Sequence, residues 1–224
     1  MRVFNKKNNW IKSSYAQSGE DLIVKYIFDN LGILRPTYID IGAHHPFYLS
    51  NTALFYETGS IGINIEPDPT LFKLFSRYRK KDININIGIG IENGVSDFYV
   101  ISTPTLNTFS KAEAERYAEE GDYKITEILK IKTCSLENVL KVHNNGRFPD
   151  FLNIDAEGLD EMIVKSIDLK NNYPIVICVE TASFSATGKS VKNTALIDLL
   201  SAKGYRIYAD TFINTIFLNH NARF

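Results

Sequence analysis

Five short apolar runs in this sequence end in polar residues that could bind a ligand. The residues at these ends are Asp40, Glu66, Asn86, Asp155 and Glu180. In an open sheet of parallel strands, ligands bind outside the carboxyl ends of the strands, so these side chains should meet. Four of the five residues are acids, which repel phosphate. A ligand with hydroxyl groups and a positive charge suits this set better than a phosphate does.

The first of these ends has one feature of a nucleotide-binding loop. Gly42 would let a ligand approach the backbone closely, but His45 and Pro46 stand where a GxGxxG motif has further glycines. Glu66 follows Asp40 by 26 positions. This spacing fits an acid that accepts hydrogen bonds from two ribose hydroxyls. It fits a surface acid before a turn equally well.

Two adjacent histidines follow this glycine. In an extended loop, His44 and His45 point in opposite directions, so one would face the ligand and the other would be structural. A neutral imidazole near pH 7 can act as a general base. Asp155, Glu157 and one histidine could instead hold Mg²⁺, which prefers carboxylate ligands. No denser carboxylate motif accompanies them, so we predict no metal site.

The chain between these ends alternates between strand and helix patterns. A strand, a helix and a strand within about 30 residues make a βαβ unit, and the pattern repeats. Near-continuous apolar strands that alternate with helices indicate an α/β fold, with a mostly parallel sheet covered by helices on both faces. We predict strands over 37–42, 61–65, 83–87, 151–155 and 175–179, and helices over 20–34, 50–57, 70–79, 135–142, 162–167 and 194–203.

Two regions depart from this alternation. Segments 95–101 and 128–133 have strand patterns, and the chain between them is mostly polar. Its charged part, 111–120, is either a solvated helix or a lid over the substrate. Near the end of the sequence, 205–208 and 214–218 are joined by a short link. We therefore predict that they form an antiparallel pair at the sheet edge.

Length and composition exclude several classes of protein. The 224 residues predict one large domain, and the net charge of -1 argues against attraction to nucleic acid. No apolar run reaches the roughly 18 residues of a transmembrane helix, and the polar N-terminus lacks the apolar core of a signal peptide. Cys134 and Cys178 lie in apolar runs, as buried reduced thiols do. We expect a cytoplasmic protein.

Several sequence blocks resemble the FkbM-like family of S-adenosylmethionine-dependent methyltransferases. Their order and spacing are more specific than any one block, and the resemblance covers residues 13–220. It implies a class I methyltransferase (Rossmann-like) fold, with a seven-stranded sheet and an antiparallel edge strand. A single domain over 15–224 would then follow an N-terminal arm over 1–14. The matching blocks are 15–21, 38–43, 50–52, 55–57, 62–67, 153–158 and Glu180.

The resemblance also implies a cofactor, S-adenosylmethionine, and residues that bind it. The loop 40–43 would cradle the amino-acid part of the cofactor, and Glu66 would accept hydrogen bonds from the ribose. Asn86 would lie near the adenine. The histidine pair departs from the family pattern at that loop. The implied cofactor-binding residues are Gln17, Asp40, Gly42, Ala43, Glu66, Pro67, Asn86 and Asp155.

For catalysis, the resemblance implies that Asp155 faces the methyl-transfer site and that Glu157 completes its motif. A hydroxyl acceptor needs a base within hydrogen-bond reach, and Asp155, His44 and His45 are the candidates. We expect O-methylation of a sugar, a glycan or a secondary metabolite, as in polysaccharide biosynthesis. One alternative is an inactive partner subunit that binds the cofactor. Another is an NAD-dependent oxidoreductase, which the missing glycines disfavour. The sequence predicts no oligomeric state.

Overall fold

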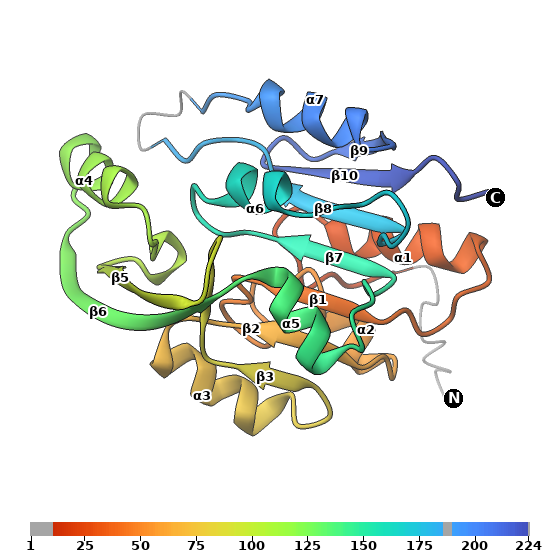
Figure 1. Ribbon diagram of the computed structural model, residues 1–224, viewed down its shortest axis with the longest axis horizontal. Helices are drawn as coiled ribbons and strands as arrows, with labels where there is room; N and C mark the ends of the chain where they lie inside the picture. The colour runs from red at the N-terminus through yellow and green to blue at the C-terminus, as the bar shows by residue number, and fades with distance from the viewer. Residues whose placement is uncertain (1–10, 186–189, 224) are drawn as a thin grey trace, which may run out of the picture.

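A seven-stranded sheet runs through the centre of the protein, with helices on both faces (Figure 1). This confirms the predicted fold class. The computed structural model describes residues 11–185 and 190–223. Most of the arm predicted over 1–14 lies outside them, as does Phe224. In spatial order the strands are β3 (Ile83–Ile85), β2 (Gly62–Ile65), β1 (Tyr38–Ile41), β7 (Phe151–Ile154), β8 (Val176–Glu180), β10 (Asn214–Asn219) and β9 (Tyr205–Asp210).

Each face of the sheet has its own apolar core. Alternation along β1 turns Ile39 and Ile41 toward one core and Tyr38 toward the other. The first core includes α5 (Leu136–His143), α6 (Asp160–Ser166) and α7 (Thr194–Ala202), and the second includes α1 (Glu20–Asn30) and α2 (Ala53–Glu57). None of the helices in the described part of the chain has the length and apolar character needed to cross a membrane.

The predicted antiparallel pair at the sheet edge consists of β9 and β10. β10 also runs antiparallel to β8, so it lies one position in from the edge, and β9 is the edge strand. All six residues of β10 are buried. The last strand of the sequence therefore completes the interior of the sheet rather than its rim.

A smaller sheet of three strands continues from the main one. Its order is β4 (Gly88–Ile89), β6 (Ile125–Cys134) and β5 (Gly94–Ile101). The strand predicted over 83–87 is confirmed as β3 but ends two residues earlier, at Ile85, because the chain then leaves the main sheet and enters the smaller sheet at β4. The charged segment forms α4 (Lys111–Glu120), which follows the short helix η1 (Pro104–Leu106). Tyr117 of α4 packs against Tyr99 and Ile101 of β5.

A buried arginine fastens the loop after β1 to its surroundings. Arg79 follows α3 (Pro69–Tyr78) and is fully buried. Its Nε lies 2.8 Å from an oxygen of Asp82, and its guanidinium donates to the hydroxyl of Tyr38 (2.7 Å) and the carbonyl of Pro46 (3.0 Å). Because Asp82 balances its charge and all three nitrogens have acceptors, Arg79 can hold this loop without an uncompensated buried charge.

Candidate active site

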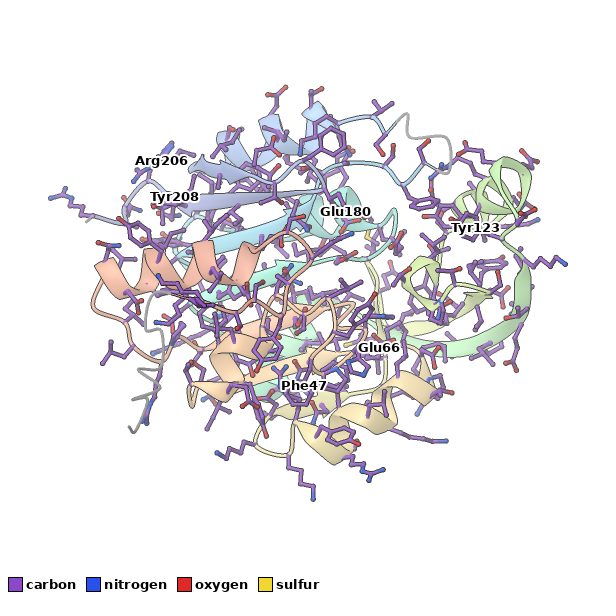
Figure 2. All side chains as sticks on the ribbon, turned by 180° about the vertical axis from the view of Figure 1, so that it is seen from behind. Phe47, Glu66, Tyr123, Glu180, Arg206 and Tyr208 are labelled. Atoms are coloured by element: carbon purple, nitrogen blue, oxygen red, sulfur yellow. The ribbon has the colours of Figure 1, made fainter. Side chains whose placement is uncertain are left out.

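A cavity of about 400 Å³ lies at the carboxyl ends of β1, β2, β7 and β8. Segment 104–109, beside the smaller sheet, and segment 182–185, after β8, form other walls. Figure 2 labels Glu66 and Glu180, which lie at this edge of the main sheet. The predicted site residues in the lining are Gln17, Asp40, Gly42, Ala43, His44, Glu66, Pro67, Asp155 and Glu157, whereas His45 and Asn86 are outside it.

Glu66 is buried and joins two loops at the end of β2. One carboxylate oxygen accepts from the backbone N–H of His44 and the other from that of Asp68, both at 2.7 Å. Burial raises the pKa of Glu66 to about 8, although the two N–H donors oppose the shift. Each oxygen has a further lone pair, so the group can still accept from ligand hydroxyls.

Asp40 and Gly42 hold the neighbouring strands together. The carboxylate of Asp40 accepts from the amide of Asn153 on β7 (2.8 Å) and from the hydroxyl of Thr52 (2.6 Å). Gly42 has φ of 74°, and a Cβ there would lie 1.8 Å from the carbonyl oxygen of Asp155. Close packing against β7 therefore requires a glycine at this position, independently of any ligand.

The two histidines have different surroundings. His44 lines the cavity, and burial together with the charge of His45 lowers the pKa of its imidazole. Nδ1 of His45 accepts the backbone N–H groups of Phe47 (3.1 Å) and Tyr48 (2.9 Å). His45 thus closes a turn outside the cavity lining, which is the structural position expected for one member of the pair.

Asn86, predicted to lie near the adenine, is placed beside the cavity and not in its lining. Its side-chain amide donates to the carbonyls of Glu66 and Pro67, at 2.8 Å each, and it is absent from the cavity lining. Asn86 thereby supports the backbone of the loop that carries Glu66. Its neighbours Ile87 and Gly88 line the cavity instead.

Three carboxylates converge where the ends of β7 and β8 meet. One oxygen from each of Asp155, Glu157 and Glu180 lies within 4.8 Å of the others, close enough for one cation to touch all three. Burial and the neighbouring acids raise the pKa of Asp155 to about 7, and raise those of Glu157 and Glu180 well above their usual values. No described residue makes a hydrogen bond to the carboxylate of Asp155 or Glu180.

Glu157 is held in place by the segment between β5 and β6. Its φ of 45° is unusual for a residue other than glycine. The hydroxyl of Tyr117 donates to its carboxylate at 3.0 Å, and that of Thr108 donates to its carbonyl at 2.7 Å. Next to it, Asp160 accepts from the backbone N–H of Ala156 at 3.0 Å. These contacts fix the turn that follows β7 and the direction of its acids.

A family model describes most of this arrangement. The model of the FkbM methyltransferase domain matches residues 40–207, from the end of β1 into β9. The chain belongs to this family. Its fold is the class I methyltransferase fold that the sequence resemblance implied, and the matched region contains the carboxylates Asp40, Glu66, Asp155, Glu157 and Glu180.

Solved structures of other methyltransferases are similar to this FkbM domain, at 9% sequence identity. A TehB-like SAM-dependent methyltransferase from Corynebacterium glutamicum matches over 90% of this chain and 87% of its own, with a TM-score of 0.44. Burkholderia thailandensis 1,6-didemethyltoxoflavin-N1-methyltransferase, with bound 1,6-didemethyltoxoflavin and S-adenosylhomocysteine, matches over 90% and 77%, with a TM-score of 0.41. No curated protein sequence matches significantly.

The segment before α1 adds Gln17 to the cavity lining of the FkbM domain. The two acids beside it have structural partners. Glu20 accepts from the backbone N–H of Ser18 (2.8 Å) and the hydroxyl of Thr211 (2.6 Å). Asp21 accepts from Ser14 and from the backbone N–H of Tyr15. The block around Gln17 therefore fixes this segment at the edge of the cavity.

Sequence reasoning missed part of the lining. Segment 104–109 reaches the cavity through η1, and the ring of Phe109 lies against Gly88 and Phe98. No periodicity or motif in this polar stretch indicated that role. Glu180 was recognised as an acid at a strand end, but it was not assigned to the site. Its position after an apolar run was the available signal.

Proposed function

We propose that this protein is an O-methyltransferase that transfers the methyl group of S-adenosylmethionine to a hydroxyl of a sugar or another small metabolite. One observation carries the proposal. A single cavity in an FkbM domain brings Glu66, at the end of β2, together with Asp155, at the end of β7. The first carboxylate suits a ribose, and the second suits an acceptor hydroxyl.

The residues of the cavity fit this cofactor. Glu66 keeps lone pairs free for hydroxyl groups, as described above. None of the described residues that line the cavity is Lys or Arg, whereas five are Asp or Glu. The bound cofactor supplies an electrophilic methyl group on a positively charged sulfonium. Carboxylates favour a positive charge nearby, so Asp155, Glu157 and Glu180 suit that end of the molecule.

Asp155 is our candidate for the base. A hydroxyl is a poor nucleophile until its proton is removed, and a base works best when its pKa lies near the operating pH. Asp155 has a pKa of about 7 and lines the cavity. His44 also lines it, with a lowered pKa that keeps the imidazole neutral, so it is the second candidate. We assign His45 a structural role.

Two measurements test the proposal. Calorimetry should show binding of S-adenosylmethionine and S-adenosylhomocysteine but not of NAD, and binding of NAD alone would overturn it. With a radiolabelled methyl group and a panel of sugars and glycans, the enzyme should yield methylated products. Asp155→Asn should lower turnover by about 10²–10⁴-fold while the affinity for S-adenosylhomocysteine changes little. Binding without turnover on any hydroxyl acceptor would indicate the inactive partner subunit instead.

We further propose that residues 15–224 act as one catalytic domain in the cytoplasm. Cys134 and Cys178 form no disulfide, as is usual for proteins of a reducing compartment. Cell fractionation with an antibody against the protein would test the location. Finding the protein outside the cytoplasm would refute it.

A further inference from the structure

A second cavity lies beside the first and shares a wall with it. Its volume is about 390 Å³, and α4, α6 and the start of α7 contribute to its lining. Glu157, Glu180 and segment 182–184 line both cavities. Methyl transfer brings two molecules together, and each cavity falls within the roughly 300–1,000 Å³ of small-molecule sites. The shared wall is where two such ligands would meet.

Most charged groups of the second cavity already have partners. Glu113 pairs with Arg116, and Glu161 pairs with Lys165. Lys192, the only Lys or Arg among the described lining residues, lies 2.7 Å from an oxygen of Asp210 and also donates to Thr181. The ammonium of Lys192 is thus paired with Asp210 and not with the carboxylates of the shared wall.

The shared wall itself keeps unbalanced carboxylates. Glu180 has no hydrogen-bond donor among the described residues, and Glu157 has only a neutral one, Tyr117, for its carboxylate. Burial and the neighbouring acids raise the pKa of both glutamates. Without a cation beside them, buried glutamates with raised pKa values keep their protons, whereas a bound cation favours their ionised form. One sulfonium can do this for one carboxylate, and a second cation at the wall would do it for another.

Aromatic rings stand next to these acids. The ring centroids of Phe184 and Tyr117 lie 5.5 Å apart in an edge-to-face arrangement, and both residues line the second cavity. Phe184 also contacts Tyr123, which Figure 2 labels near α4, and the centroids of these two rings lie 5.5 Å apart. Aromatic rings together with carboxylates are the surroundings in which proteins bind ammonium groups.

We infer that the second cavity binds the methyl acceptor and that this acceptor carries a protonated amine as well as its hydroxyl. The ammonium lies between Glu157 and Glu180, and the hydroxyl faces Asp155 across the shared wall. An amino sugar has both groups on a compact ring. An acceptor with a carboxylate is rejected, because it would face like charges. This inference rests on the proposed function, since it assigns the acceptor of the same reaction.

Three sugars of similar size and different charge test the inference. Glucosamine is a cation, glucose is neutral and glucuronate is an anion. Their binding to the protein saturated with S-adenosylhomocysteine can be followed by NMR titration. We expect glucosamine to bind tightest and glucuronate not to bind. Equal binding of glucosamine and glucose, or no binding of glucosamine at the highest concentration reached, overturns the inference.

Variants of Glu180 test whether a preference for glucosamine over glucose depends on the shared wall. Glu180→Gln keeps the shape but removes the charge, and should weaken glucosamine binding by about tenfold to a hundredfold, so that glucosamine no longer binds tighter than glucose. Glu180→Asp keeps the charge and should keep the preference, even if the first variant is unstable. Glu119→Gln removes the same charge from an exposed position on α4 and is the control. A preference that survives Glu180→Gln overturns the inference.

Two further outcomes distinguish this inference from the proposed function and from a metal site. Failure of S-adenosylhomocysteine to bind refutes the proposed function, whereas normal binding without amine preference refutes the acceptor assignment alone. If Mg²⁺ raises the melting temperature and Glu180→Gln abolishes the effect, the three carboxylates form a metal site. That result also overturns the amine assignment.

Discussion

Replacing Glu66 by alanine should weaken cofactor binding at every pH, whereas its effect on the stability of the fold should change with pH. The side chain offers its carboxylate to the cavity and also accepts the N–H groups of His44 and Asp68. Because Glu66 holds its proton at pH 7, each of the two hydrogen bonds lost to the ribose is worth about 0.5–1.5 kcal/mol, or about 1–3 kcal/mol together. We therefore expect the Kd for S-adenosylhomocysteine to rise by about tenfold to a hundredfold in Glu66→Ala.

The effect on stability contains two opposing contributions. Two buried N–H groups lose their acceptor, at about 1–3 kcal/mol each. Against this, the pKa of Glu66 is raised from 4.5 to about 8 in the fold. Holding a proton on this group at pH 7 costs the native state about 3 kcal/mol, at 1.36 kcal/mol per pKa unit. The gain of about 3 kcal/mol offsets part or all of a loss of about 2–6 kcal/mol at pH 7, so the variant should fold.

This cancellation depends on pH with a definite sign. Between pH 4.5 and about 8 the native state holds a proton on Glu66 that the unfolded chain has lost, so this residue lowers the stability as the pH rises. Alanine removes that slope. The variant should melt below the wild type at pH 5, and the difference should shrink or reverse by pH 8.

Calorimetry and thermal unfolding at several pH values measure both effects. Asn86→Ala is the matched control, because it removes two hydrogen bonds from the same loop but no group from the cavity. It should leave the Kd nearly unchanged. A folded Glu66→Ala that binds S-adenosylhomocysteine as the wild type does would refute the ribose assignment. A difference in melting temperature that stays constant with pH would refute the stability argument.

Three other predictions concern catalysis and the scaffold. If Asp155 is the base, kcat/KM should rise with pH and level off above about 7, and a flat profile would exclude that role. Gly42→Ala should lower the melting temperature, since its Cβ would meet the carbonyl of Asp155 at 1.8 Å, and an unchanged value would contradict this packing. Arg79→Met leaves Asp82 buried without its cation, which should cost about 3–5 kcal/mol. Thermal unfolding should show a large loss of stability, whereas the exposed Arg77→Met should show little.

Much of the main sheet could be predicted because its strands bury both faces. Isoleucines recur along β1 and β2 for that reason, on either side of one buried polar residue in each strand, and the turns and helices between the strands have local signals. The smaller sheet had no comparable signal. β4 is two residues long, and its partner Thr133–Cys134 lies more than 40 positions later in the sequence. Pairing at such a distance depends on the whole fold and not on local pattern.

The candidate site divides in the same way. Parallel strands end at one edge, so their order predicted that Glu66, Asp155 and Glu157 would line one cavity. The directions of loop side chains could not be predicted. Asn86 and His45 turn to backbone carbonyls and N–H groups that the loops leave without partners. Which backbone groups lack partners depends on the folded path of each loop, and residue spacing does not predict that path.

The place of β10 has a consequence for how the protein is made. A ribosome releases β9 before β10, yet β9 has no partner in the sheet except β10. Until residues 214–219 emerge, β8 also presents an open edge, and such an edge invites pairing with other chains. The nascent chain can assemble β1, β2, β7 and β8, but β9 cannot join the sheet before β10 is made. The edge of β8 is therefore open to pairing with other chains until β10 is available to cover it.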